Sequence, residues 1–132
     1  MSLLLDTDTC ASIIRQVPPA SDHFARTTVP LYLSAVSVTE LEIWLLRHRT
    51  PLRYRQPYFT LQQGVTVLNV TEPIAHRAAL LSVAPGRRGP KFGLGDALVA
   101  ATALEQGLTL VTHSGQRFAN IAGLTVLDWA VP

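Results

Sequence analysis

The segment LLLDTDTCASIIR, residues 3–15, decides the fold class because it places a short apolar strand directly before a helix. The run Leu3-Leu4-Leu5 ends at Asp6, and the following residues can form a helix that Val17-Pro18-Pro19 stops. A short strand that is apolar throughout is typical of a parallel sheet covered on both faces. The segment therefore predicts the first strand and helix of an α/β domain.

The remainder of the chain repeats this alternation, with strands predicted at residues 31–33, 65–68, 108–111 and 124–127. Strands that alternate with helices form βαβ units with parallel pairing. We therefore expect one domain over residues 1–132, a three-layer α/β/α sandwich around a mostly parallel sheet of about five strands. Helices are predicted at residues 20–27, from Ser34 or Ser37 to 45, at 51–64, at 71–84 and at 96–107, with a loop at 85–90.

The composition indicates a folded globular domain. Apolar residues make up 48% of the chain and charged residues 15%, which argues against disorder. Cys10 is the single cysteine, so no intrachain disulfide forms, and its apolar surroundings favour buried packing. The start of the chain lacks a signal-peptide pattern and no apolar run has the length of a membrane span. We expect a cytoplasmic protein that is not associated with a membrane.

The basic residues are almost all arginine, with Lys91 the only lysine. Guanidinium groups match the geometry of phosphate and carboxylate, so this composition favours a polyanion or an acidic partner. The net charge of only +2 does not decide the matter. Phosphate contact and solvated surface explain the two basic clusters equally well. They are Arg47, Arg49, Arg53 and Arg55, and then Arg87, Arg88 and Lys91.

Three acidic residues fall where a parallel sheet collects its ligands, which is the crevice beyond the carboxyl ends of the strands. Asp6 ends the first predicted strand, and Asp8 follows it closely. Glu40 lies in the helix after the second strand, and Asp96 begins the helix before the fourth. Asp6, Glu40 and Asp96 are therefore the candidate catalytic residues.

Each of these acids also has a purely structural explanation. Asp6 and Asp96 are good N-cap residues, and Ser37-Val38-Thr39-Glu40 has the pattern of a capping box. Helix capping explains each acid taken alone. It explains less easily why three acids fall at one edge of a sheet. Clustered carboxylates repel, and some stay protonated unless a cation neutralises them. An oxygen-only set suits Mg²⁺ or Mn²⁺, and the histidines have no zinc-ligand spacing.

Together, the motifs of the chain resemble a known family, the PIN domains of the VapC toxin type. Residues 4–8 (LLDTD), 34–41 (SAVSVTEL) and 95–103 (GDALVAATA) are similar to the first three motifs of that family. LVTH at residues 110–113 resembles the fourth motif, and LTVLDW at 124–129 resembles the closing strand. No single motif is specific, but their order and spacing extend over essentially the whole chain.

The resemblance implies a Mg²⁺- or Mn²⁺-dependent endoribonuclease that hydrolyses RNA as the toxin of a type II toxin–antitoxin pair. It implies that Asp6, Glu40 and Asp96 hold the metal, that a cognate antitoxin covers the site, and that the protein forms a homodimer. A metal so held lowers the pKa of a bound water, orients it for in-line attack and neutralises the phosphoryl oxygens. The auxiliary candidates are Asp8, Thr112, Ser114 and Arg117, with the two hydroxyls orienting water or phosphate.

The chain departs from the family in its fourth motif. Ser114 stands where the family has Asn, and Arg117 stands where it has a last carboxylate. Three acids remain, enough for one metal, whereas a second metal and full activity come into question. Arg117 could instead contact substrate phosphate, or neutralise Asp6 or Asp96.

Three other classes of protein were weighed against the sequence, and the first of them is supported by Arg117 in the fourth motif. A degenerate PIN domain that binds RNA or a protein partner without efficient cleavage is favoured by Arg117. A phosphoacceptor signalling domain requires an Asp after the third strand, where this chain has Asn69, and a Lys after the last. A nucleotide-binding domain requires a glycine-rich loop, and no G-x-G-x-x-G follows the first strand.

Overall fold

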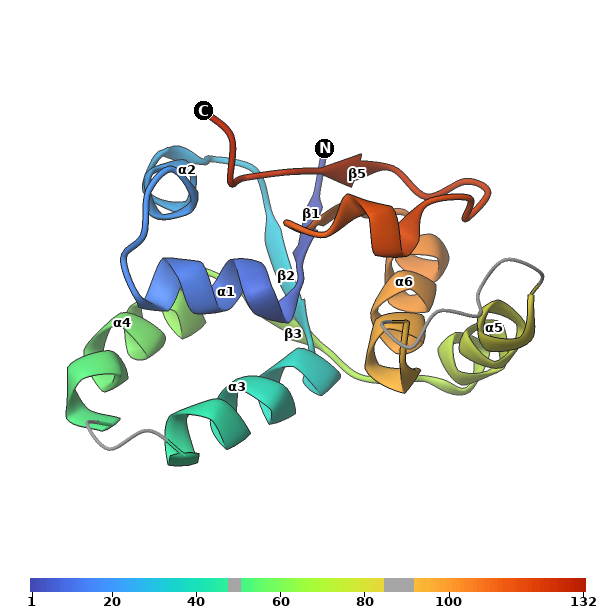
Figure 1. Cartoon of the computed structure of the whole chain (residues 1–132), viewed down its shortest axis with the longest axis horizontal. Helices are drawn as coiled ribbons and strands as arrows, with labels where there is room; N and C mark the ends of the chain where they lie inside the picture. The colour runs from blue at the N-terminus through green and yellow to red at the C-terminus, as the bar shows by residue number, and fades with distance from the viewer. Residues whose placement is uncertain (48–50, 85–91) are drawn as a thin grey trace.

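A computed structural model describes residues 1–47, 51–84 and 92–132 of the chain, in which short strands alternate with helices (Figure 1). In chain order the elements are β1 (Leu3–Leu5), α1 (Thr7–Ile14), α2 (Ala20–Arg26), β2 (Leu31–Ser34), α3 (Ala35–Arg47), α4 (Pro51–Gln63), β3 (Thr66–Leu68), α5 (Glu72–Val83), α6 (Leu94–Gln106), β4 (Thr109–Val111), the 3-10 helix η1 (Gly115–Phe118) and β5 (Val126–Leu127).

The strands form one parallel sheet in the order β3-β2-β1-β4-β5, which confirms the expected sheet. The central strand is β1, where Leu4 lies beside Tyr32 on one side and Leu110 on the other. After β3 the chain crosses to the far side of β1 to form β4. Beside β1 the winding of the chain therefore changes direction, and α/β sheets bind ligands beyond the carboxyl ends of the strands at such a point.

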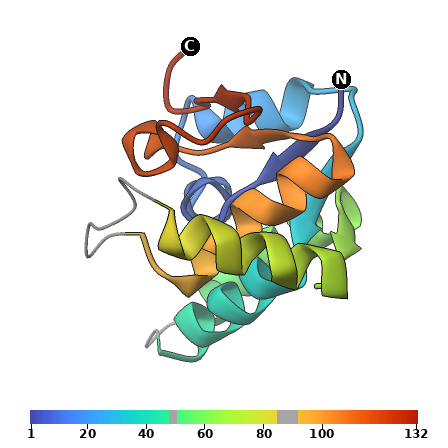
Figure 2. The same cartoon turned by 90° about the vertical axis from the view of Figure 1, so that its right-hand side faces the viewer.

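Helices cover both faces of the sheet, as the apolar strands predicted (Figure 1), and Figure 2 looks onto the face that α5 and α6 cover. Leu3 and Leu5 pack into a buried cluster with residues of α1, α2, α3 and α4, whereas Leu4 packs on the opposite face with Val99 and Ala103 of α6. α5 lies against α6 in the same outer layer and buries Ile74 and Ala78 there. The three-layer α/β/α sandwich is thus confirmed.

The boundaries of several elements differ from those predicted, and three of them bear on the site or on the edge of the sheet. α3 begins at Ala35, where the hydroxyl of Ser34 accepts the backbone N–H of Val36 at 3.1 Å. α6 begins at Leu94, two residues before the predicted start, and β5 spans only Val126–Leu127 as an edge strand that pairs with β4.

Two sequence predictions fall wholly or partly on residues 48–50 and 85–91, which lie outside the described residues. They concern the loop at 85–90 and four members of the basic clusters, Arg49, Arg87, Arg88 and Lys91. Cys10 is fully buried, as expected. Across the ranges that the structure describes, no helix has the length and apolar character needed to cross a membrane.

Candidate active site

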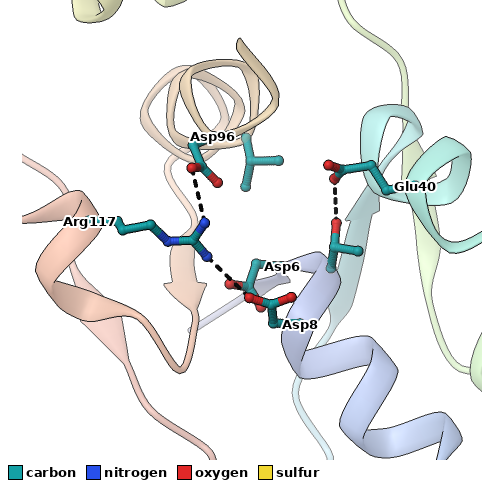
Figure 3. A pocket seen from close by; sticks show the side chains of 7 residues that line it. Asp6, Asp8, Glu40, Asp96 and Arg117 are labelled. Carbon is teal, nitrogen blue, oxygen red and sulfur yellow. Dashed lines mark hydrogen bonds and ion pairs between the residues drawn. The ribbon is translucent and has the colours of Figure 1, made fainter. Parts of the chain in front are cut away.

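Four carboxylates line one hollow beyond the carboxyl end of β1, together with Thr7, Val99 and Arg117 (Figure 3). We call it the acid hollow. Asp6 directly follows β1, Glu40 lies on α3 after β2, and Asp96 lies at the start of α6. The structure therefore brings together the three acids singled out in the sequence. Asp8, which was an auxiliary candidate, lines the same hollow.

Asp6 is the most deeply placed of these acids, with 5% of its surface exposed. It is the N-cap of α1, and its Oδ1 accepts the backbone N–H of Thr9 at 2.8 Å. Burial raises the pKa of Asp6 and the neighbouring Asp8 charge adds to this, while hydrogen bonds from Thr112 and Thr9 oppose it. Asp6 thus caps a helix and lines the hollow at once.

Asp96 lies in the first turn of α6 but does not cap it. The N-cap is Gly93, so the N-cap interpretation of Asp96 is wrong, and the Gly93 backbone N–H instead hydrogen-bonds to the Asp96 carboxylate. Burial raises the pKa of Asp96; Arg117 lowers it, and the charges of Glu40 and Asp6 raise it further. Asp6 and Asp96 therefore share an environment that disfavours their charged forms, and a bound cation would reverse this.

Glu40 is held by a residue that sequence reasoning missed. The hydroxyl of Thr7 donates to Glu40 Oε1 at 2.6 Å, across 33 positions of sequence. The capping-box interpretation of Ser37 and Glu40 is wrong because α3 starts at Ala35, which leaves Ser37 inside the helix. The Ser37 side chain is buried there, with no hydrogen-bond partner among the described residues. Glu40 is thus positioned by α1 and not by a cap.

Arg117 bridges two of the acids (Figure 3). Its Nη1 lies 3.2 Å from Asp96 Oδ2 and its Nη2 lies 3.2 Å from Asp8 Oδ2. The sequence suggested that Arg117 could contact a substrate phosphate or neutralise Asp6 or Asp96. The structure shows the ion pair with Asp96. The second partner is Asp8, which sequence reasoning missed because 109 positions separate the two residues.

The other auxiliary candidates lie on the turn between β4 and η1. Thr112 is fully buried; its hydroxyl accepts the Ser114 N–H at 3.0 Å and hydrogen-bonds to Asp6. Ser114 lies in a second hollow, which is lined by Asp8, His113, Ser114, Gly115, Gln116 and Arg117. Because Asp8 and Arg117 line both hollows, the two adjoin.

The chemistry of the acid hollow fits a divalent cation. Carboxylate oxygens are preferred ligands of Mg²⁺ and Mn²⁺, and burial of Asp6 and Asp96 leaves them in need of positive charge. Within residues 1–47, 51–84 and 92–132, no three Asp, Glu, His or Cys side chains converge closely enough to enclose an ion. Two of the candidate ligand oxygens, Asp96 Oδ2 and Glu40 Oε1, are instead occupied by Arg117 and Thr7.

Fold and site together define an α/β domain with a carboxylate-lined hollow beside the central strand of a parallel sheet. Within that class, the chain belongs to the PIN-domain family, whose pattern matches residues 3–124. The family resemblance of the sequence motifs is thereby confirmed.

Several of the proteins that the chain is similar to are VapC proteins. The chain is similar to Ribonuclease VapC10 of Mycobacterium tuberculosis, with 37% identity over 112 residues, 83% of this chain and 80% of that one. It is 25% identical over 130 residues to the tRNA(fMet)-specific endonuclease VapC of Salmonella typhimurium, covering 98% of both chains. Among solved structures, it resembles the DNA-bound VapBC of Salmonella typhimurium with a TM-score of 0.84 and 25% identity, again over 98% of both chains.

Proposed function

We propose that this protein is a Mg²⁺- or Mn²⁺-dependent endoribonuclease that acts as the toxin of a type II toxin–antitoxin pair. The observation that carries this proposal is the acid hollow, in which Asp6, Glu40 and Asp96 meet from three separate segments of the chain. The names of its relatives, a ribonuclease and a tRNA endonuclease, support RNA as the substrate.

In this proposal Asp6 and Asp96 bind the metal directly, and Glu40 binds it directly or through water. An ion held by these residues would supply an activated water and neutralise charge on the scissile phosphate. Thr112 fixes the Asp6 carboxylate by its hydrogen bond, and Thr7 fixes that of Glu40. A carboxylate already held in place does not have to be ordered when the ion binds, which favours binding.

The RNA strand would extend from the acid hollow into the second hollow, since the two adjoin at Asp8 and Arg117. Ser114 lies in the second hollow, where its hydroxyl can donate to a phosphate or ribose oxygen. An RNA substrate and a buried, unpaired Cys10 both suit the cytoplasm.

We also propose a cognate antitoxin as the partner, with a basic side chain that reaches the acids and blocks the metal site. The VapBC relative supports this assignment. A homodimer is proposed as well, because large apolar side chains remain exposed on the helices. They include Leu46 (74% exposed), Leu52 (87%), Phe59 (55%), Leu80 (70%) and Val83 (81%). Light scattering coupled to size-exclusion chromatography would give the mass, and a monomer at micromolar concentration would refute the dimer.

The proposed activity is tested by incubating labelled RNA with the protein and Mg²⁺, with EDTA and a DNA strand of the same sequence as controls. We expect RNA fragments only when Mg²⁺ is present. Cleavage that persists in EDTA, or no cleavage of any RNA, would contradict the proposal. RNA binding without cleavage would instead favour the degenerate PIN domain, for which the ion pair between Arg117 and Asp96 is the supporting observation.

A further inference from the structure

We propose that Arg117 is a built-in second cation of the acid hollow, so that the chain binds a single divalent ion and uses the Arg117 guanidinium to contact the RNA phosphate. This inference rests on the proposed nuclease function and specifies how its site is charged. It concerns the position at which this chain carries an arginine in place of a carboxylate.

The guanidinium occupies the place that a second ion would need. It lies between Asp8 at the start of α1 and Asp96 at the start of α6, at 3.2 Å from one oxygen of each (Figure 3). A second metal ion bound by the same two oxygens would face a positive charge at close range, beside an Asp96 side chain that is only 21% exposed and so is weakly screened by solvent. Arg117 therefore excludes a second ion and partly neutralises the acids in its stead.

Arg117 is also held firmly in this position. It lies on η1, and its side chain is only 26% exposed. The next residue, Phe118, is buried in the core at 2% exposure, and the guanidinium carbon lies 5.9 Å from the centre of its ring. Such a contact between a cation and an aromatic face adds to the two ion pairs. The guanidinium is thus a fixed part of the site and not a mobile surface charge.

The guanidinium retains donors for a substrate. Each terminal nitrogen carries two N–H groups and, among the residues that the structure describes, is engaged by one carboxylate oxygen, so one N–H on each remains. Arg117 also lines the second hollow. A phosphate at the junction of the two hollows would meet these donors, and guanidinium forks match phosphate oxygens. A carboxylate at position 117 would repel the same phosphate unless a metal ion lay between them.

The number of bound ions tests the first half of the inference. We expect calorimetric titration with Mn²⁺, without RNA, to give one ion per chain for the wild type and two for Arg117→Asp. Arg26→Asp is the matched control, since Arg26 lies on α2 with its side chain 79% exposed and undergoes the same change of charge. It should bind one ion. Two ions on the wild type would overturn the inference, and that result requires no variant to fold.

RNA binding tests the second half. In EDTA, where no cleavage is expected, the Kd of a fluorescent RNA should rise about tenfold in Arg117→Gln, the loss expected for one charge-assisted hydrogen bond. The slope of log K against log salt should flatten by about 0.7, the value for one phosphate contact on a single strand. Arg26→Gln should change neither quantity. An unchanged Kd and slope in a folded Arg117→Gln would overturn the phosphate contact.

The two proposals fail in distinguishable ways. Metal-dependent cleavage by a wild type that binds two ions would leave the nuclease standing and remove the role of Arg117. One bound ion and Arg117-dependent RNA affinity, without any cleavage, would support the role of Arg117 and refute the nuclease.

Discussion

The hydroxyl of Thr7 donates a 2.6 Å hydrogen bond to Oε1 of Glu40 and so joins the first turn of α1 to the second turn of α3 across the acid hollow. This bond fixes the direction of a carboxylate that is otherwise exposed to solvent. The position of Glu40 therefore depends on a residue of the first motif, although the two residues belong to different helices.

Replacement of Thr7 by Val should weaken metal binding while leaving the fold intact. The substitution removes the donor but keeps a side chain of similar shape, so Glu40 becomes free to rotate. We expect the Kd for Mn²⁺ to rise roughly three- to tenfold, the range for a partly exposed charge-assisted hydrogen bond. Thr7→Ser retains the hydroxyl and is the matched control. Equal Mn²⁺ affinity in Thr7→Val and Thr7→Ser would show that the bond has no role in the site.

Substitution of Gly95 should separate stability from activity. A Cβ at this position would lie 3.2 Å from Glu40 Oε2, so Gly95→Ala must displace the carboxylate. Because Gly95 is the second residue of α6, in its first turn and not in its interior, alanine should also stabilise the helix by about 0.5 kcal/mol or less. We expect a higher Tm together with slower cleavage and weaker Mn²⁺ binding.

Gly93→Ala provides the comparison, because no atom of the described residues lies within 4 Å of a Cβ at Gly93. It should cleave at the wild-type rate. If Gly95→Ala cleaved as fast as Gly93→Ala, the close approach of Gly95 to Glu40 would be irrelevant to the site.

The pH dependence of unfolding should reveal the buried Asp6 carboxyl. Burial raises its folded-state pKa above the ordinary 3.8, so the folded protein holds this proton more tightly than the unfolded chain does. The free energy of unfolding therefore falls as the pH rises from about 3.8 through the raised pKa.

Asp6→Asn removes this dependence and keeps an N-cap side chain for Thr9. In EDTA at pH 7 we expect the variant to be more stable than the wild type, and the difference to vanish below pH 3.8. Excess Mg²⁺ should stabilise only the wild type. Urea unfolding across this pH range gives the comparison, and a variant less stable than the wild type at pH 7 in EDTA would contradict the burial argument.

His113 should contribute to stability by tying the C-terminal segment to α1. One ring nitrogen, Nε2, lies 3.1 Å from Ser12 Oγ, and the other, Nδ1, lies 3.3 Å from Asp128 Oδ1. His113→Ala removes both contacts and should lower the free energy of unfolding by about 1–2 kcal/mol. His76→Ala, at a side chain 77% exposed, should change it little. Equal stability of the two variants would show that the His113 contacts contribute nothing.

The fold was predictable because its signals are local. Leu3–Leu5 is apolar at every position, as a strand covered on both faces must be, and several turns fall at Gly or Pro, among them Pro18-Pro19, Gly64 and Gly107. Asp6 and Asp96 could be placed at the same edge of the sheet from topology alone. In a parallel sheet, the end of β1 and the start of the helix that precedes β4 both lie at the carboxyl edge of the strands.

The contacts within the site were not predictable. The bond between Thr7 and Glu40 and the ion pair between Arg117 and Asp8 join distant positions, and no local pattern reports such pairs. The capping-box pattern at Ser37 gave a wrong helix start for a related reason. Its residue types fit the first turn of a helix, but a local pattern does not show that the helix has already begun at Ala35.

The rate of RNA cleavage by Asp6→Asn at saturating Mg²⁺ tests the central claim most directly. Asp22→Asn is the matched control, since Asp22 lies on α2 with its side chain 55% exposed. We predict that Asp6→Asn lowers the single-turnover rate by about a hundredfold or more, the scale expected when electrostatic support of the transition state is lost, and that Asp22→Asn equals the wild type. A folded Asp6→Asn protein that cleaves RNA at the wild-type rate would contradict the account.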